Sequence, residues 1–213
     1  MILEQIIVGP LQTNCYIIGC EKTLEAAVID PGDEMDKIIT VINENNINVK
    51  YIFVTHAHVD HIAHLLKLKQ EIHAEIVMHA DDQFLFDTAA IQAMMFGLSD
   101  PGNPEPDRLV SDNEIIKVGD LEVKVLHTPG HSPGSVTYHV DNHLFVGDLI
   151  FAGSIGRTDL PGGNYTTLIN SVKSKIFTLA DETIIYPGHG PSTSVGEEKK
   201  YNPFFNSYSL FSL

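Results

Sequence analysis

The chain has 213 residues, of which 43% are hydrophobic and 19% charged. A chain of this length can bury about 70% of its unfolded surface, which argues against disorder and favours one domain over residues 1–213. Its 28 acidic residues outnumber 13 basic ones, and the formal charge of −15 disfavours nucleic acid and anionic membranes as partners, because like charges repel.

Hydrophobic periodicity predicts alternating strands and helices in the first half of the chain. Short apolar runs predict strands at residues 2–8, 16–18, 26–29, 51–54 and 75–78. Apolar residues at helical spacing predict helices at residues 34–45 and 61–70, with a further helical stretch near residues 82–86. This order indicates a mixed α/β fold.

A turn-rich connection separates the two halves. Three prolines between Phe96 and Arg108 exclude a helix or a central strand there, so we expect a surface loop. Beyond it, the pattern predicts strands at residues 115–118, 121–127, 135–140, 144–147 and 183–186, a helix at residues 166–179 and a closing helix at residues 194–201. The second half therefore repeats the plan of the first.

The two cysteines and the first residues bear on the compartment. Cys15 and Cys20 are too few for the disulfide framework of a small secreted protein, so we expect both to be reduced core residues. Residues 1–9 contain the acidic Glu4, no basic segment and only a short apolar run, which argues against a signal peptide. These features favour a cytoplasmic protein.

Four apolar, β-branched runs end at a possible metal ligand. The four ligands are His56, His131, Asp148 and His189. Strands hold their ends rigidly, and binding groups in α/β folds gather outside the carboxyl ends of strands, so we expect these turns to converge. A Pro-Gly pair before His131 and His189 turns the chain sharply at two of them.

The densest group of possible ligands is in residues 55–61, THAHVDH, which contain His56, His58, Asp60 and His61. Three imidazoles and a carboxylate are too polar for a core segment unless a charged group satisfies them, as a metal ion would. This ligand set suits Zn²⁺, iron or Mn²⁺, whereas Ca²⁺ and Mg²⁺ prefer oxygen ligands throughout. The sequence therefore predicts a transition-metal site.

The THAHVDH segment resembles the T-H-x-H-x-D-H signature of the metallo-β-lactamase superfamily, and the later ligands follow in that family's order. The resemblance implies an αββα sandwich of two mixed β-sheets flanked by helices. It also implies two divalent metal ions per chain, most simply Zn²⁺, with Fe or Mn as alternatives. The implied ligands are His56, His58 and His131 for one ion, Asp60, His61 and His189 for the other, and Asp148 bridging both.

Residues 152–164, AGSIGRTDLPGGN, and residues 188–203 are similar to short, single-domain relatives of glyoxalase II, the hydroxyacylglutathione hydrolases. The resemblance implies hydrolysis of a small thioester such as S-lactoylglutathione by a metal-bound hydroxide, with Asp60 and Asp148 at the catalytic centre. Longer glyoxalase II enzymes have an added helical domain with basic groups for glutathione, which residues 1–213 do not include. Recognition of glutathione is therefore left open.

Two other activities remain as alternatives. A related family of mononuclear iron persulfide dioxygenases also has a Gly-Arg-Thr-Asp stretch like residues 156–159. Hydrolysis of another ester, a lactone, a β-lactam or a phosphodiester is the second alternative, because one metal pair serves all of them within this fold. A metal-free binding module is disfavoured by the intact ligand set, and metal retention after dialysis would exclude it.

Several further polar residues have two interpretations. Asp30 either orients an imidazole ligand or forms a turn before Pro31, and Arg157 either binds a substrate carboxylate or, as we prefer, pairs with Asp159. Two lysines of the closing helix, Lys199 and Lys200, are expected to face solvent. The remaining histidines are expected to be surface or hydrogen-bonded structural groups: His64, His73, His79, His127, His139 and His143.

Overall fold

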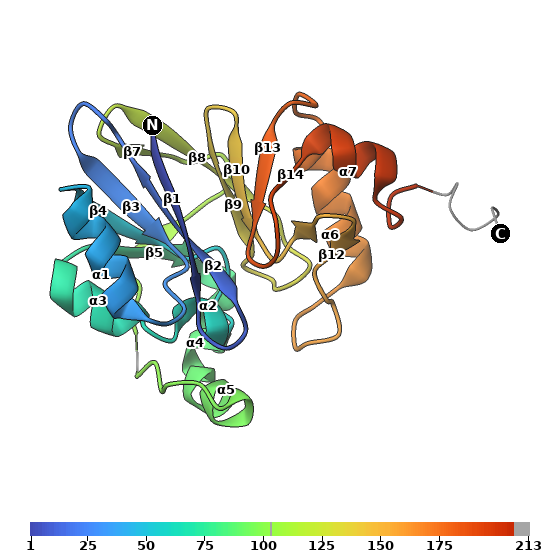
Figure 1. The fold of residues 1–213 in the computed structure, drawn as a ribbon. Coiled ribbons are helices and arrows are strands. Elements are labelled where there is room, and N and C mark those ends of the chain that lie inside the picture. The colour runs from blue at the N-terminus through green and yellow to red at the C-terminus, as the bar shows by residue number, and fades with distance from the viewer. Residues whose placement is uncertain (103, 207–213) are drawn as a thin grey trace.

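The computed structural model of the protein describes residues 1–102 and 104–206. Two six-stranded sheets pack face to face, and helices cover the outer face of each (Figure 1). The first sheet has the order β1-β2-β3-β4-β5-β6, with antiparallel pairs as far as β3 and parallel pairs beyond it. Its strands are β1 (Ile2–Val8), β2 (Thr13–Gly19), β3 (Glu25–Ile29), β4 (Asn48–Phe53), β5 (Glu75–His79) and β6 (Arg108–Val110).

The second sheet has the order β14-β13-β10-β9-β8-β7, in which only β10 and β13 pair in parallel. Its strands are β7 (Ile115–Val118), β8 (Leu121–His127), β9 (Val136–Val140), β10 (His143–Gly147), β13 (Ile184–Pro187) and β14 (Thr193–Ser194). A short hairpin, β11 (Ile150–Phe151) with β12 (Ser154–Ile155), follows β10. Both sheets are therefore mixed, as expected.

The core has an inner layer between the sheets and two outer layers under the helices. In the inner layer the rings of Phe53 and Tyr138 stack with centroids 4.5 Å apart. Helices α1 (Met35–Glu44) and α3 (Leu65–Ile72) cover the first sheet with Ile38 and Leu68, while α6 (Tyr165–Ser171) and α7 (Val195–Tyr201) cover the second with Leu168 and Val195 (Figure 1). The expected αββα sandwich is confirmed.

Three helical segments differ from the prediction. The helix expected at residues 61–70 is two helices, α2 (Val59–Ile62) and α3, because His64 leaves helical geometry and its Nδ1 accepts a hydrogen bond from Met35 N at 3.3 Å. The helix expected at residues 166–179 ends as α6 at Ser171 and continues only as a π-helical turn, Val172–Ile176. Beyond the predicted stretch near residues 82–86 lies an unpredicted helix, α5 (Ala89–Phe96), whose apolar residues are spread around its circumference.

The two cysteines and the closing helix agree with the predictions. Cys15 and Cys20 are buried and free. Ser194 caps α7, accepting a hydrogen bond from Glu197 N at 3.2 Å. Within residues 1–102 and 104–206, no helix is both long and apolar enough to cross a membrane.

Candidate metal centre

The expected strand ends meet at one end of the sandwich. The loop after β4 brings His56 and His58, the loop between β8 and β9 brings His131, and the residues just after β10 and β13 are Asp148 and His189. Asp60 and His61 come from α2. His56, His58, His61 and His131 are buried, and the other three residues of the group are partly exposed.

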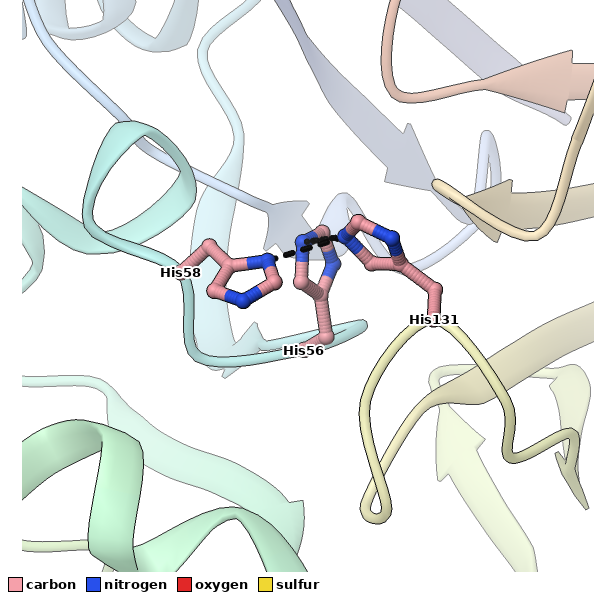
Figure 2. A group of neighbouring side chains, drawn as sticks. All are labelled: His56, His58 and His131. Carbon is pink, nitrogen blue, oxygen red and sulfur yellow. Dashed lines mark hydrogen bonds between the residues drawn. The ribbon is translucent and has the colours of Figure 1, made fainter. Parts of the chain in front are cut away.

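Three imidazoles form the first half of the centre (Figure 2). His131 Nε2 lies 2.9 Å from His58 Nδ1 and 3.2 Å from His56 Nε2. Burial first, and then the neighbouring histidines, lower the pKa of His56 well below its usual value and that of His58 to about 3. Both rings are therefore neutral at neutral pH and offer lone pairs to a cation.

The second half of the centre pairs imidazoles with a carboxylate. Asp60 Oδ2 lies 3.2 Å from His189 Nε2 and 3.6 Å from His61 Nε2. Burial opposes charge on His61, but the carboxylates of Asp60 and Asp148 outweigh it and raise the His61 pKa well above its usual value. This half is rich in negative charge.

Asp148 lies between the two halves. Its Oδ1 is 3.5 Å from His61 Nε2, and its Oδ2 is 3.7 Å from both His131 Nε2 and His189 Nε2. One carboxylate therefore lies close to imidazole nitrogens of both groups.

Two buried atoms of the centre lack a hydrogen-bond partner. They are His61 Nε2 and Asp148 Oδ1, and in the described part of the chain only His143 Nδ1 shares this condition. Leaving a buried polar atom unpaired is costly, and a cation would satisfy both atoms. Neutral imidazoles in one half and imidazoles with carboxylates in the other make a donor set that fits divalent transition metals.

The comparisons with known proteins agree with this geometry. The family model "Metallo-beta-lactamase superfamily" matches residues 8–189. The chain belongs to this superfamily. It is 41% identical over 213 residues to "Hydroxyacylglutathione hydrolase GloC" of Haemophilus influenzae, which covers 98% of this chain and 100% of that protein.

Two solved structures of the superfamily are similar over nearly the whole chain. The BLEG-1 B3 metallo-beta-lactamase has a TM-score of 0.90 at 35% identity, covering 97% of this chain and 100% of that one. TTHA1623 in a di-iron-bound form has a TM-score of 0.87 at 36% identity, covering 94% and 99%. Relatives of this chain are named as hydrolases, and its clustered histidines and aspartates suit the binding of divalent metal ions.

Two imidazoles of the centre each donate a hydrogen bond from Nδ1 to a backbone carbonyl oxygen. His131 Nδ1 donates to Arg157 O at 2.8 Å, and His189 Nδ1 donates to Leu11 O at 3.1 Å. Such a bond fixes the proton on Nδ1, so that Nε2 of each ring presents a lone pair to the centre.

Asp30 has the same role at His61, and this decides between its two interpretations. Its Oδ2 accepts from His61 Nδ1 at 2.9 Å and from Thr55 Oγ1 at 2.6 Å, while its Oδ1 accepts from Thr55 N at 2.8 Å. Thr55 Oγ1 in turn lies 3.1 Å from His56 Nδ1. One buried carboxylate thus orients the His61 imidazole directly and the His56 imidazole through Thr55.

Asp82 is a supporting residue that the sequence analysis did not single out. Its buried carboxylate accepts hydrogen bonds from Ala57 N at 3.0 Å, Ser132 Oγ at 2.7 Å and Gly134 N at 2.6 Å. It therefore joins the loop of His56 and His58 to the loop of His131. The available signal was its place three residues beyond β5, at the same sheet edge as the loop of His56 after β4.

Gly188 allows the loop of His189 to approach the centre. A Cβ on this residue would collide with Asp148 Oδ1 and with His61 Cε1. Any larger residue would therefore displace two of the converging side chains.

The remaining polar residues have other partners. His64 Nε2 lies 3.3 Å from Asp33 Oδ1, and the rings of His79 and His127 stack with centroids 4.0 Å apart. Arg157 pairs with Asp159 through two bonds of 2.8 and 2.9 Å, as we preferred. Two further pairings involve Lys199, whose Nζ lies 2.7 Å from Asp181 Oδ1, and Lys200, which lies over the ring of Tyr201.

A cavity of about 550 Å³ opens over the centre. His58, Asp60, His131, Asp148 and His189 line it. A small molecule in this cavity would therefore contact both halves of the centre.

Proposed function

We propose that the protein is a hydrolase that cleaves a small thioester at a centre of two divalent metal ions. His56, His58 and His131 would hold one ion, Asp60, His61 and His189 the other, and Asp148 both. The position of the Asp148 carboxylate carries the proposal, because its two oxygens lie within 3.5–3.7 Å of ligand nitrogens from both groups. A carboxylate between two ligand sets suits a two-ion centre better than a single ion.

When bound, the metal pair would supply a hydroxide nucleophile at neutral pH and polarise the substrate carbonyl. The residues of the chain prepare the site for this chemistry. Burial keeps His56 and His58 neutral, and the outer hydrogen bonds hold the other imidazoles in place. Asp60 and Asp148 line the cavity as ionised carboxylates, so each can accept a hydrogen bond from water and orient it towards the substrate.

The relatives support a thioester and a metal pair in different ways. GloC is named as a hydroxyacylglutathione hydrolase and matches this chain over almost its full length. TTHA1623 was solved in a di-iron-bound form, which supports a two-ion centre and makes iron an alternative to zinc. BLEG-1 is named as a metallo-beta-lactamase, so β-lactam hydrolysis is the first competing activity to test.

The test combines metal analysis with kinetics. The purified protein is dialysed, its metal content is measured, and thiol release from S-lactoylglutathione and from neutral thioesters is followed for the Zn²⁺, Fe²⁺ and Mn²⁺ forms. We expect two ions per chain and thiol release. Two bound ions with no thiol release from any thioester would refute the proposal, and a β-lactam assay beside it would detect the competing activity.

The persulfide dioxygenase alternative is tested in the same preparation. One iron per chain and O₂ consumption with glutathione persulfide would select the dioxygenase. Two ions and no O₂ consumption would exclude it.

A further inference from the structure

The cavity over the centre has an apolar wall that no ligand residue explains. Helices α4 (Gln83–Asp87) and α5 contribute Phe84, Ile91, Met95 and Phe96 to it, and Leu160 with Pro161 lie in the loop after β12. The side chains of Ile91 and Met95 are 61% and 76% exposed, and that of Phe96 is 50% exposed. Large apolar side chains gathered beside a polar centre are typical of a surface that a ligand covers.

The charge of the cavity disfavours a substrate that carries carboxylates, as the peptide glutathione does. Apart from the histidines of the centre, Arg157 is the only cationic side chain among the described lining residues. Both Nε and Nη2 of its guanidinium are already bonded to the Asp159 carboxylate. Lys199 of α7 is paired with Asp181 and does not line the cavity.

Glutathione has two carboxylates, and this cavity offers them no unpaired cation among its described lining residues. An apolar group would instead be removed from water on α4 and α5. The flexible side chain of Met95 can adapt to groups of different shape. The wall lies in the same cavity as Asp60 and Asp148, so a thioester could place its carbonyl at the centre and its apolar part on the wall.

We propose that the preferred substrate is a thioester with an apolar acyl group, which packs on Ile91, Met95 and Phe84, and not a glutathione thioester. This inference rests on the proposed thioesterase activity and specifies its substrate class. Each methylene that enters the wall should raise kcat/KM about fourfold, the factor expected from burying one CH₂ group. The gain in kcat/KM should stop when the acyl chain is longer than the apolar wall.

The experiment uses the metal-loaded protein and acyl thioesters of one neutral thiol, N-acetylcysteamine. Thiol release is compared for acetyl, butanoyl, hexanoyl and octanoyl groups and for S-lactoylglutathione. We expect kcat/KM to rise with acyl length and the octanoyl thioester to exceed S-lactoylglutathione. A flat series, or S-lactoylglutathione as the best substrate, would overturn this inference and leave the thioesterase proposal intact, whereas no thiol release at all would overturn both.

Variants of α5 separate the wall from the centre. Met95→Gln and Ile91→Gln should lower kcat/KM for the octanoyl thioester about tenfold and for the acetyl thioester much less, because a two-carbon acyl group covers little of the wall. Both residues are exposed, so their exchange should not disturb the fold. Met94→Gln is the matched control, since Met94 is 79% exposed on the same helix but does not line the cavity. Equal losses for both thioesters, or an effect of Met94→Gln as large as that of Met95→Gln, would contradict the packing of the acyl group on the apolar wall.

A charged variant tests whether the lack of an unpaired cation in the cavity disfavours glutathione thioesters. Met95→Lys places an ammonium group in the cavity and should shift the preference from the octanoyl thioester towards S-lactoylglutathione. The ratio of the two kcat/KM values is the readout, so a partial loss of folded protein cancels. An unchanged ratio would show that the cavity charge does not select the substrate.

Discussion

Asp30 Oδ2 lies 2.9 Å from His61 Nδ1, although the two residues are 31 positions apart and come from different elements. Asp30 directly follows β3 with a φ of 53°, in the left-handed region, and its side chain is buried. This backbone conformation is uncommon for residues other than glycine and indicates that the carboxylate position is under strong constraint. The same oxygen accepts from Thr55 Oγ1, so the residue connects the loop of His56 with α2.

The first prediction concerns Asp30→Ala. Loss of the hydrogen bond to His61 should weaken metal binding at the group of Asp60, His61 and His189 by roughly 10- to 100-fold, the usual effect of removing an outer partner. Competition with a chelator measures this affinity. Asp33→Ala is the control, because Asp33 contacts His64 outside the centre. Equal affinities in the Asp30 variant and the parent protein would contradict an orienting role.

The second prediction concerns Asp148→Ala. This exchange removes a carboxylate whose two oxygens lie close to imidazole nitrogens of both halves, so we expect fewer than two ions per chain and loss of thioester hydrolysis. Elemental analysis and thiol release are measured on the same sample, with circular dichroism to check the fold. A variant that keeps two ions and the parent rate would show that Asp148 does not bridge them.

The third prediction concerns Asp82→Ala. Three buried donors, Ala57 N, Ser132 Oγ and Gly134 N, would lose their acceptor, which should lower the free energy of unfolding by about 3 kcal/mol. Urea unfolding of the metal-free protein measures this change without a contribution from metal. The neighbouring Asp81 is exposed, and Asp81→Ala should change stability little. Similar midpoints for the two variants would refute the linking role of Asp82.

The convergence of the four turns that carry His56, His131, Asp148 and His189 was predictable because its signal is local. An apolar strand that stops at a histidine or aspartate appears four times, and the structure brings those four turns together. The identity of His56, His58 and the other five residues as metal ligands remains a prediction until metal is measured. The layers of the fold followed from the same strands and from the family resemblance.

The supporting residues and the cavity wall were less predictable because their roles depend on distant contacts. Asp82 follows the exposed Asp81 near the start of a helical stretch, and only the fold brings its carboxylate to Ser132 and Gly134. Helix α5 escaped prediction because its apolar residues face both the protein and the cavity, which removes the one-sided pattern. The break between α2 and α3 depends on His64 and its contact with Met35, which periodicity does not reveal.

The last prediction is that the two ions respond differently to acid. The His61 and His189 pKa values are raised, so protons compete with a metal ion for these rings at higher pH than they do at an ordinary histidine. The His56 pKa is lowered well below its usual value and the His58 pKa to about 3, so a metal ion there meets little competition.

Lowering the pH from about 8 to about 5, a range that spans the usual histidine pKa, should therefore release the ion at Asp60, His61 and His189 before the ion at His56, His58 and His131. Equilibrium dialysis with metal analysis at each pH measures the loss. Two single-site variants assign it: His189→Ala should bind its remaining ion down to lower pH than His58→Ala. The direction follows from the sign of each shift, because a raised pKa places proton competition at higher pH and a lowered pKa places it at lower pH. Release of both ions at the same pH, or in the reverse order, would show that the carboxylates around His61 do not control its protonation.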